Sequence, residues 1–401
     1  MHPRVTRRAF LQRGTVILAG VPLLLAGCGS GGSPSTATPV ATARPSAPAS
    51  TPPPTPAPQG MTSPDYGIQV FLWGSATAER DLGLVKEMGF RWVKQSIEWR
   101  YVEPHKKGSF EFNEPDRLLG LIESAGLRLI ARVDNQPVWA RADKVFPGNG
   151  PPDRIQDFAD FVHALAVRYK GRIAAYELWN EPNLAREWGN APPDPKHYVE
   201  LLKAGYEAIK SADPQALVIS AGLAPTTASG AIAMPDIQFI KEMYQAGAAK
   251  YFDLLGAHGA GYKAPPEMSP DAVASDPAFN HGEGAAGRIY CFRHVEDVRK
   301  VMEENGDGAK RVAVLEFGWT TDNRPGSPYQ WHAVTEQQQA DYLVGAYEWA
   351  RAHWQPWIGV MSAIYIAAPY WTPNDEEYYW SITRPDGTVR PAYRALAAMP
   401  K

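Results

Sequence analysis

Short apolar runs alternate with longer segments of helical periodicity from residue 61 to residue 401. The short runs, about four to eight residues rich in Val, Ile, Leu and Tyr, are typical of buried β-strands. The longer segments place apolar residues three and four positions apart, as Phe158, Phe161, Val162 and Leu165 do in Ile155–Tyr169. A strand followed by a helix, repeated eight times, predicts one α/β domain of the (β/α)8 barrel type.

The boundaries of these elements follow from where each pattern starts and stops. The expected strands are Tyr66–Trp73, Trp92–Ser96, Arg128–Val133, Ala174–Trp179, Ala216–Ala221, Tyr251–Ala257, Arg311–Phe317 and Val360–Ala367. The expected helices are Ala78–Met88, Asp116–Ala125, Ile155–Tyr169, Lys196–Ala212, Ile237–Ala246, Arg293–Asn305, Glu336–His353 and Ala392–Met399.

The first 27 residues have the pattern of an export signal. A basic segment precedes the apolar run Val16–Ala26, which is too short to span a bilayer comfortably. Thr6–Leu11 resembles a twin-arginine signal. Leu25-Ala26-Gly27-Cys28 resembles the lipobox of bacterial lipoproteins, whose cysteine is lipidated as the signal is removed. The alternative is an ordinary cleaved signal with an incidental cysteine at position 28.

Residues 28–60 are rich in Pro, Ser and Thr and contain no aromatic residue, so they cannot bury enough apolar surface to fold. We expect a disordered linker that is extended by its prolines and tethers the folded part to a lipid anchor. The organisation is therefore a signal at 1–27, a linker at 28–60 and a catalytic barrel at 61–401. This predicts a lipoprotein on the outer face of the cell membrane, or a secreted protein.

Composition excludes several classes of function. The formal net charge of the 401 residues is −3 and no dense Lys/Arg stripe is present, so nucleic acid is not an expected partner. Once Cys28 is lipidated, Cys291 is the remaining cysteine, and no intrachain disulfide is expected. His-Glu-x-x-His and Cys-x-x-Cys spacings are absent from the sequence, so we expect neither a catalytic metal nor a cofactor. We expect a monomer that meets the membrane through its anchor only.

Two carboxylates stand at the ends of expected strands. Glu181 lies in Trp179-Asn180-Glu181-Pro182, directly after the fourth strand, where the proline stops the ladder. Glu316 stands at the end of the seventh strand and precedes a break at Gly318. A pair of carboxylates held at strand exits is what acid/base or nucleophilic work on a glycosidic bond requires.

These motifs resemble those of the clan A glycoside hydrolases, most closely the family 39-like and family 5-like members, over essentially all of Met61–Lys401. The resemblance rests on Asn180-Glu181 after the fourth strand and on Glu316 at the end of the seventh. It implies a (β/α)8 fold and a retaining mechanism, with Glu181 as general acid/base and Glu316 as nucleophile.

The implied roles make different demands on the two carboxyls. Glu181 has to carry a proton between turnovers, which calls for apolar or anionic surroundings, and Trp179 and Trp188 are candidates to supply them. Glu316 needs donors that keep it ionised. For these donors the clan pattern offers His258 and Tyr262, beyond the sixth strand.

The resemblance implies further substrate-binding residues. Asn180 matches the asparagine that bonds the sugar 2-hydroxyl; the alternative is a turn residue that caps its own backbone. Lys94 departs from the clan's arginine near the end of the second strand and lacks its planar fork. Arg132, on the third strand, either substitutes for that arginine or is a structural ion-pair residue.

Tryptophans beyond the strands are candidates for stacking on sugars. Trp371, after the eighth strand, matches a position where the clan commonly stacks the sugar of the cleaved subsite. For Trp99, Trp139 and Trp319, substrate contact and structural packing both stay open. The long excursion Lys263–Phe292 is expected to cover one side of the cleft.

The leading hypothesis is a retaining glycoside hydrolase that cleaves β-linked polysaccharide or oligosaccharide outside the cell. Endo action is favoured because no additional sugar-binding module is apparent in the sequence. One alternative is a transglycosylase that acts on surface polysaccharide with the same residues. Another is a non-catalytic carbohydrate-binding surface protein on the same scaffold, since fold alone does not determine activity.

Overall fold

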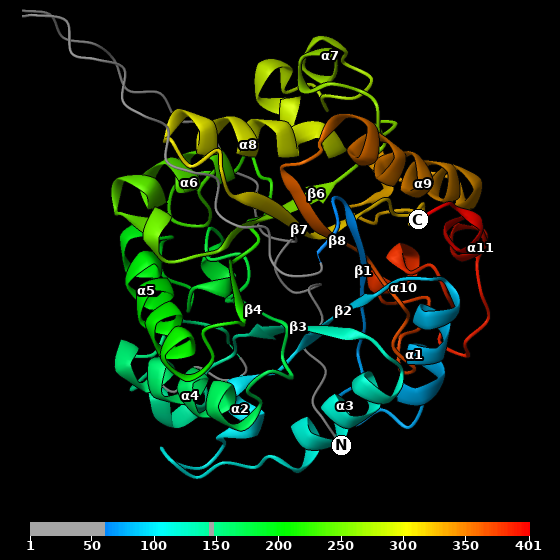
Figure 1. The fold of residues 1–401 in the computed structure, drawn as a ribbon. Helices are drawn as coiled ribbons and strands as arrows, with labels where there is room; N and C mark the ends of the chain where they lie inside the picture. Colours follow the sequence, from blue (N-terminus) through cyan, green and yellow to red (C-terminus); the bar gives the residue numbers. More distant parts are fainter. Residues whose placement is uncertain (1–60, 144–147) are drawn as a thin grey trace, which may run out of the picture. The chain divides into compact units, whose positions relative to one another are not determined.

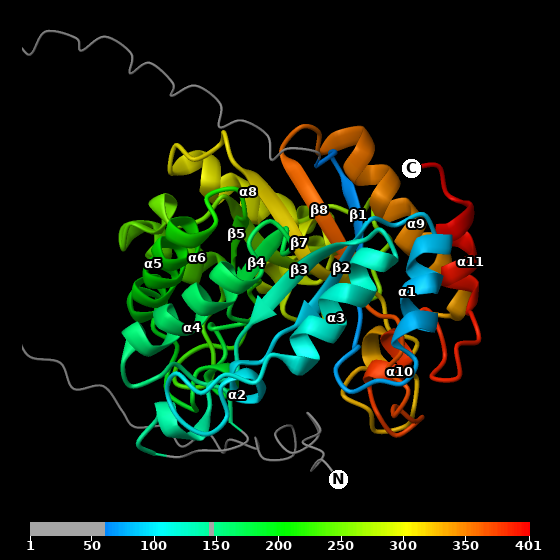
Figure 2. The ribbon, with the colours of Figure 1, turned by 60° about the horizontal axis from the view of Figure 1, so that its bottom comes forward.

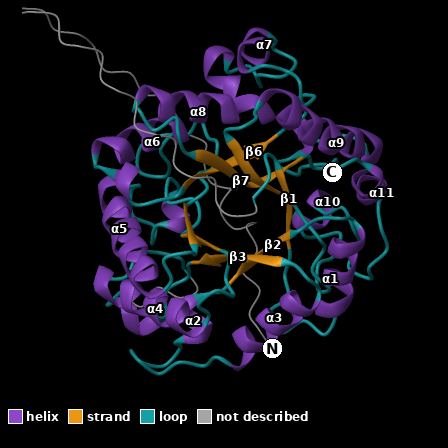
Figure 3. Cartoon of the chain, viewed as in Figure 1, coloured by secondary structure: helices purple, strands orange, loops and turns teal. Residues whose placement is uncertain are grey.

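Eight parallel strands close into a barrel in this computed structural model, which describes residues 61–143 and 148–401. Each strand pairs with its neighbour in sequence, and the eighth returns to the first through pairs such as Gly67 with Ser362. Helices form a ring outside the strands (Figure 1, Figure 3). The expected (β/α)8 barrel is confirmed.

The strands follow one another around the barrel in chain order. They are β1 (Asp65–Gln69), β2 (Trp92–Ser96), β3 (Arg128–Val133), β4 (Ala175–Leu178), β5 (Leu217–Ser220), β6 (Leu254–Ala260), β7 (Arg311–Gly318) and β8 (Ile358–Ala363). The helices that follow the eight strands in turn are α1 (Ala78–Glu87), α3 (Asn113–Ser124), α4 (Ile155–Arg168), α5 (Pro195–Ala212), α6 (Asp236–Gln245), α8 (Val295–Glu304), α9 (Glu336–His353) and α11 (Pro391–Ala398).

Short helices lie in the loops between these elements. They are α2 (Trp99–Val102), α7 (Pro270–Ser275), α10 (Glu377–Trp380), η2 (Val138–Ala140), η3 (Ala185–Glu187), η4 (Ala248–Lys250), η5 (Gly284–Ile289), η6 (Phe292–His294) and η7 (Gln330–His332). Figure 2 shows α2 and α10, which follow β2 and β8, at the same end of the barrel. That end is where the carboxyl ends of the strands meet.

Several expected boundaries differ from those observed. The first strand ends at Gln69 and the eighth at Ala363, each four residues before the expected end. Apolar residues continue beyond both ends because the loops there are buried: Val70 and Ile366 are 1% and 2% exposed. The apolar pattern therefore reports burial rather than strand pairing. The sixth strand extends to Ala260, three residues beyond its expected end.

Local sequence explains where the longest helices begin. Helix α5 starts at Pro195, whose fixed φ suits a first turn, and the Asp194 carboxylate accepts a 3.0 Å hydrogen bond from the backbone of His197. Helix α9 starts with a capping box, in which Thr335 and Gln338 bond each other's backbone N–H groups. Such caps satisfy donors that have no partner inside a helix.

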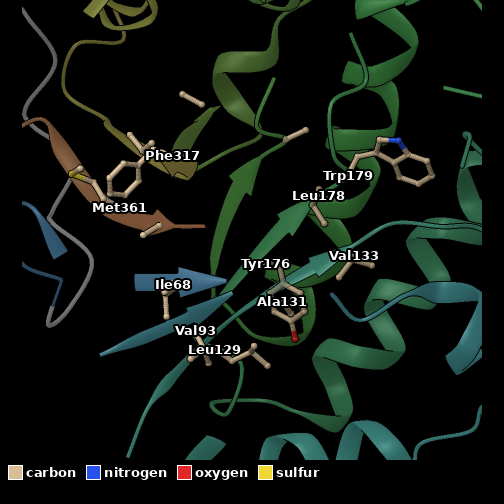
Figure 4. Packing of buried hydrophobic residues seen from close by; sticks show 14 of the residues in the cluster. Ile68, Val93, Leu129, Ala131, Val133, Tyr176, Leu178, Trp179, Phe317 and Met361 are labelled. Atoms are coloured by element: carbon tan, nitrogen blue, oxygen red, sulfur yellow. The ribbon is translucent and has the colours of Figure 1, made fainter. Parts of the chain in front are cut away.

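Apolar side chains fill both sides of the strands. The inner cluster has members from seven strands, which can meet only inside the barrel: Trp92, Ile130, Ala175, Ile219, Leu254, Ala313, Leu315 and Val360. The outer cluster packs the strands against the helices and includes Ile68, Val93, Leu129, Tyr176 and Phe317 (Figure 4). Because successive side chains of a strand point to opposite faces, strands buried on both faces read as continuous apolar runs.

The expected signal at 1–27, the lipidation of Cys28 and the linker at 28–60 lie outside the described residues and stay predictions. Within the described part of the chain, no helix combines the length and apolar character needed to cross a membrane. The described residues fall in one compact unit.

The seam between β5 and β6 depends on a glycine. A Cβ added to Gly256 would lie 2.1 Å from the carbonyl oxygen of Ser220, a backbone atom that cannot move independently. Gly256 also donates its N–H to the Ser220 hydroxyl at 2.9 Å. We expect Gly256→Ala to lower the free energy of unfolding by about 3 kcal/mol or more, because overpacking has to separate the two strands.

The matched control is Gly83→Ala within α1, where an added Cβ meets no atom within 4 Å. This change should leave stability equal or raise it by about 0.4–1 kcal/mol, by restricting the unfolded chain. Urea unfolding of both variants measures the difference. Equal stability of Gly256→Ala and the unsubstituted protein would contradict the tight β5–β6 seam.

Candidate active site

Charged side chains from four strands and one strand exit converge at the carboxyl end of the barrel. Lys94 comes from β2, Arg132 from β3, His258 from β6 and Glu316 from β7, while Glu181 follows β4. Contacts of 3.1 to 4.0 Å join the five into one cluster around Glu316 and His258. Parallel strands place their carboxyl ends at one rim, which is where (β/α)8 barrels build active sites.

The structure brings the two sequence-predicted carboxylates together. One oxygen of Glu181, a ring nitrogen of His258 and one oxygen of Glu316 all lie within 4.8 Å of one another. The histidine Nδ1 stands 3.1 Å from Glu181 Oε1 and 4.0 Å from Glu316 Oε2. Both glutamates are buried, at 6% and 9% exposed. His258, expected beyond the sixth strand as a donor to Glu316, lies on that strand and contacts Glu181 more closely.

An unusual backbone conformation presents Glu181 to the site. Trp179 and Glu181 have φ values of 78° and 44°, in the left-handed region that non-glycine residues seldom occupy. The N–H of Glu181 donates to the carbonyl of Gly222 at 3.0 Å. Gly222 is itself required, because a Cβ there would lie 2.2 Å from His258 Nε2. Sequence reasoning missed this residue; its signal is a glycine directly after the expected fifth strand.

Cations surround Glu316. Lys94 Nζ lies 3.2 Å from its Oε1, and an Arg132 guanidinium nitrogen lies 3.7 Å from the same oxygen. Burial raises the pKa of the Glu316 carboxyl, but the charges of Lys94, His258 and Arg132 outweigh that effect and hold the pKa well below its usual range. Glu316 is therefore ionised at neutral pH, as a nucleophile has to be.

Lys94 is shared with a second carboxylate, Glu177 of β4, which sequence reasoning missed. Its Nζ lies 3.1 Å from Glu177 Oε2, and the two side chains are 1% and 0% exposed. Burial raises the pKa of Glu177, and the charges of Lys94 and Arg132 oppose the increase. The signal in the sequence is a charged residue inside an otherwise apolar strand, Ala-Tyr-Glu-Leu.

The surroundings of Glu181 differ from those expected. Trp179 and Trp188 are buried in the core that packs against the helices, where their rings meet edge to face at 5.8 Å. The Glu181 carboxylate instead has a cationic neighbour, Arg186, whose guanidinium donates to Oε2 at 2.9 Å. The two tryptophans thus pack away in the core, whereas Glu316, within 4.8 Å, is an anionic neighbour of the kind also expected. Arg186 is a functional candidate that sequence reasoning missed.

Arg132 and Asn180 lie beside each other near Glu316. The guanidinium of Arg132 is 3.0 Å from Asp134 and 3.7 Å from Glu316, so this residue joins a structural ion pair and also faces the Glu316 carboxylate. Asn180 is 5% exposed and its side-chain oxygen accepts a long hydrogen bond of 3.5 Å from Arg132. Its amide is thus turned toward the charged site.

Tyr262 does not take the expected position beside Glu316. Its hydroxyl donates to the carbonyl of Pro225 at 3.3 Å, and its ring packs against Tyr290 at 4.7 Å between centroids. The excursion Lys263–Phe292 folds with it into an apolar cluster of its own that includes α7 and η5 residues. His281 of this excursion stacks on Trp331, at 4.1 Å, and so joins it to the loop after β7.

Two of the candidate tryptophans are packed inside the protein. Trp99 and Trp319 are both fully buried. Their indole N–H groups donate to Glu103 at 2.6 Å and to the carbonyl of Ala264 at 2.9 Å, respectively. Such rings anchor loops and have no free face for a sugar.

Trp139 and Trp371 keep part of their surface exposed. The ring of Trp139 meets Trp99 edge to face, and that of Trp371 meets Phe71 and Tyr365 edge to face at 4.6 and 5.5 Å. These two residues therefore stay candidates for sugar stacking.

Glu181, His258 and Glu316 each offer one atom that a metal ion could use. The two carboxylates are already neutralised, however, by Lys94 at 3.2 Å and Arg186 at 2.9 Å. Cations at these distances repel another cation strongly inside a buried site. The cluster fits an acid/base pair better than a metal centre.

Comparison with known proteins gives a family match over part of the chain and a shared fold. Residues 56–246 match the family model "Cellulase (glycosyl hydrolase family 5)". Among solved structures, a family 39 glycoside hydrolase from Bacteroides cellulosilyticus is similar at TM-score 0.61 and 24% identity, over 84% of this chain and 63% of that chain. The present chain thus spans less than two thirds of that enzyme.

Two shorter enzymes match along almost their whole length. An endo-beta-1,4-glucanase from Xanthomonas axonopodis pv. citri has TM-score 0.53 and 14% identity, over 83% of this chain and 97% of that chain. A xylanase from Paenibacillus barcinonensis has TM-score 0.54 and 12% identity, over 84% and 96%. At these identities the likeness shows a shared fold, the (β/α)8 barrel.

The shared ammonium of Lys94 generates a stability prediction. Lys94→Met should lower the free energy of unfolding by about 3–5 kcal/mol, because it leaves buried carboxylates without their cation. Adding Glu177→Gln to that variant should recover part of the loss, since one uncompensated charge is removed. Denaturant unfolding of both single variants and the double variant measures the coupling, and strictly additive effects would contradict a shared buried network.

Proposed function

We propose that the chain is a retaining glycoside hydrolase. The premise is its match to the glycosyl hydrolase family 5 (cellulase) model together with its (β/α)8 barrel, the fold of the clan A enzymes that it resembles. Its substrate is a β-linked polysaccharide or oligosaccharide, Glu181 is the general acid/base and Glu316 is the nucleophile. The observation that carries the proposal is the buried approach of these two carboxylates, with oxygens within 4.8 Å.

The separation favours retention over inversion. Retaining enzymes hold their carboxyls about 5–5.5 Å apart, so that one can attack the sugar directly, whereas inverting enzymes need about 6.5–9.5 Å to admit a water molecule. An oxygen-to-oxygen distance of at most 4.8 Å between Glu181 and Glu316 fits the first arrangement.

The reaction follows from the two positions. In the first step a Glu316 oxygen attacks the anomeric carbon, the bond from that carbon to the glycosidic oxygen breaks, and the proton of Glu181 passes to the leaving oxygen. In the second step Glu181 takes a proton from water, the water oxygen attacks the anomeric carbon, and the Glu316 carboxylate leaves. The two steps together retain the anomeric configuration, because each inverts it once.

Neighbouring side chains prepare Glu316 for the first step. Lys94, Arg132 and His258 hold the carboxyl ionised despite its burial. Lys94 stands where the clan has an arginine, and its contact with Glu316 at 3.2 Å supports the same role by a single charge rather than a fork. Because Glu316 is already ionised, no proton has to be removed from it before it attacks.

This electrostatic arrangement also weighs against a purely sugar-binding protein. The largely buried charges of Lys94 and Arg132 around one carboxylate are costly to desolvate, and binding a neutral sugar does not require them. A transglycosylase would use the same residues and differ in accepting a sugar hydroxyl in place of water. Products longer than the substrate distinguish it from a hydrolase.

The proposals on where the enzyme acts and on endo action depend on the sequence alone. The segment at 1–60 supports export and a lipid anchor at Cys28, with the enzyme on the outer face of the cell membrane or secreted. An exported enzyme meets polymers and oligomers rather than cytoplasmic disaccharides. We therefore propose cleavage within extracellular polysaccharide by a monomer, with the membrane contacted through the anchor alone.

Glutamine variants separate the two roles. Glu316→Gln should lower kcat/KM by at least about a thousandfold on every substrate, because no covalent intermediate forms. Glu181→Gln should lose about a hundredfold to ten-thousandfold on polysaccharides, but far less on dinitrophenyl β-glycosides, whose leaving group needs no proton. Hydrolysis is followed on a panel of β-linked polysaccharides and aryl β-glycosides, with product anomers observed by NMR.

The control for this experiment is Glu123→Gln, an exposed carboxylate at the end of α3 away from the site, which should leave kcat/KM unchanged. A chelator is present throughout, so that an activity dependent on a metal ion at Glu181, His258 and Glu316 would be lost in the unsubstituted enzyme too. Initial α-product from a β-substrate, or full activity of either glutamine variant, would overturn the assignment.

The charges around Glu316 also predict a pH dependence. Lys94→Gln removes the charge that most strongly lowers the pKa of Glu316, while His258, Arg132 and Glu181 still face that carboxyl. The pKa of Glu316 therefore rises, and the acidic limb of the pH profile of kcat/KM should move to higher pH by about 1–3 units. Lys94→Arg should restore the limb; an unmoved limb in Lys94→Gln would show that Lys94 does not ionise the nucleophile.

A further inference from the structure

Both oxygens of the Glu181 carboxylate have a nitrogen neighbour. Oε1 lies 3.1 Å from Nδ1 of His258, a residue that is 5% exposed. Oε2 accepts a hydrogen bond of 2.9 Å from Arg186, whose side chain is 43% exposed. The buried histidine stands on the inner side of Glu181, so Oε2 is the oxygen on the side that opens to solvent.

The loops after β4 and β5 hold Arg186 in this place. Arg186 is the central residue of η3, and the preceding Ala185 donates its N–H to the carbonyl of Ile232 at 2.9 Å. Leu184 and Ala233 form a β-bridge beside that bond. The backbone under Arg186 is thus fixed, while its partly exposed side chain is able to change partner.

The general acid cannot work while Arg186 keeps this contact. Glu181 has to carry its proton on the oxygen that faces the leaving group, and a guanidinium on that oxygen both occupies it and favours the carboxylate form. Arg186 therefore has to leave Oε2 when the substrate enters. The leaving sugar is bonded through the oxygen that Glu181 protonates. It therefore lies within reach of the guanidinium that has left Oε2.

We propose that Arg186 is a specificity-determining residue that binds an acidic group, such as the carboxylate of a uronic acid, on the leaving-group side of the scissile bond. This inference rests on the proposed function and names the substrate class of the same site. Guanidinium groups pair with carboxylates in a planar, two-bonded geometry, and a partly exposed one can do so without losing all its hydration.

An acidic leaving group acts on both partners of the Glu181–Arg186 pair. It attracts the guanidinium and, by removing it from Oε2, leaves Glu181 ready to hold a proton. A neutral leaving group does not attract the guanidinium. Arg186 then stays on Oε2, in competition with the proton, or turns to its other neighbour, Glu187, at 3.5 Å. The preference for an acidic substrate should therefore appear in kcat as well as in KM.

The test uses two leaving groups of the same shape that differ in charge. Aryl β-glycosides of the sugar that the enzyme cleaves best in the panel are prepared with 3-carboxyphenyl and 3-carbamoylphenyl leaving groups. We expect the unsubstituted enzyme to favour the carboxylate by about tenfold to a hundredfold in kcat/KM, the range of a charge-assisted hydrogen bond. Arg186→Gln should abolish this ratio, and Arg186→Lys should keep part of it.

The matched control is Arg172→Gln. Arg172 is 38% exposed, close to the exposure of Arg186, and pairs with Glu123, but it precedes β4 at the opposite end of the barrel. The ratio should be unchanged in this variant, which excludes an effect of net charge alone. Thermal unfolding of each variant checks that the fold is intact.

The outcomes distinguish this inference from the proposed function. Equal kcat/KM for the two glycosides in the unsubstituted enzyme, or the same ratio in Arg186→Gln, would overturn the role of Arg186 while hydrolysis itself stands. Activity that persists in Glu316→Gln would overturn the proposed function and the inference with it. A ratio lost in Arg172→Gln as well would also overturn the role of Arg186, because it would assign the preference to overall charge.

Discussion

The ammonium group of Lys94, buried inside the barrel between two carboxylates, is the interaction on which the site depends. It lies 3.1 Å from Glu177 and 3.2 Å from Glu316, and water has almost no access to it. Charges in such a place are tolerated only as a compensated group, and removal of one member leaves the others unpaired. The same contact that neutralises buried charge also keeps Glu316 ionised, so folding and the proposed chemistry share one network.

Barrel closure is the second condition. Glu181 and Glu316 come from strand ends that are three strands apart, and they approach within 4.8 Å because parallel strands deliver their ends to one rim. Small residues make the approach possible. Gly222 leaves room for the ring of His258, and Gly256 lets β6 come close to β5. The strained backbone of Glu181 is held against these elements by its bond to Gly222.

The two carboxylates differ in how their cations are held. Lys94 and Arg132, the cations beside Glu316, are largely buried on β2 and β3 and cannot leave, so that carboxylate stays charged. The cation on Glu181 is Arg186, whose side chain is 43% exposed and belongs to a loop. A nucleophile needs a permanent charge, whereas an acid/base has to alternate between two forms. In the proposed roles, the buried Lys94 keeps Glu316 charged, whereas the exposed Arg186 can leave Glu181 and let it change form.

The sequence alone determined the eight strands, the barrel, and both glutamates, because these follow from local patterns: apolar runs, helical periodicity and carboxylates at strand exits. It also identified Lys94 and Arg132 as charged residues of β2 and β3. Only the tertiary structure decided which charges meet. Arg186, Glu177 and Gly222 are recognised by what lies opposite them in space, and Tyr262, Trp99 and Trp319 proved to be turned into packing. Periodicity records which face of an element is buried, but a contact between strands depends on register, loop conformation and rotamer, which no local pattern records.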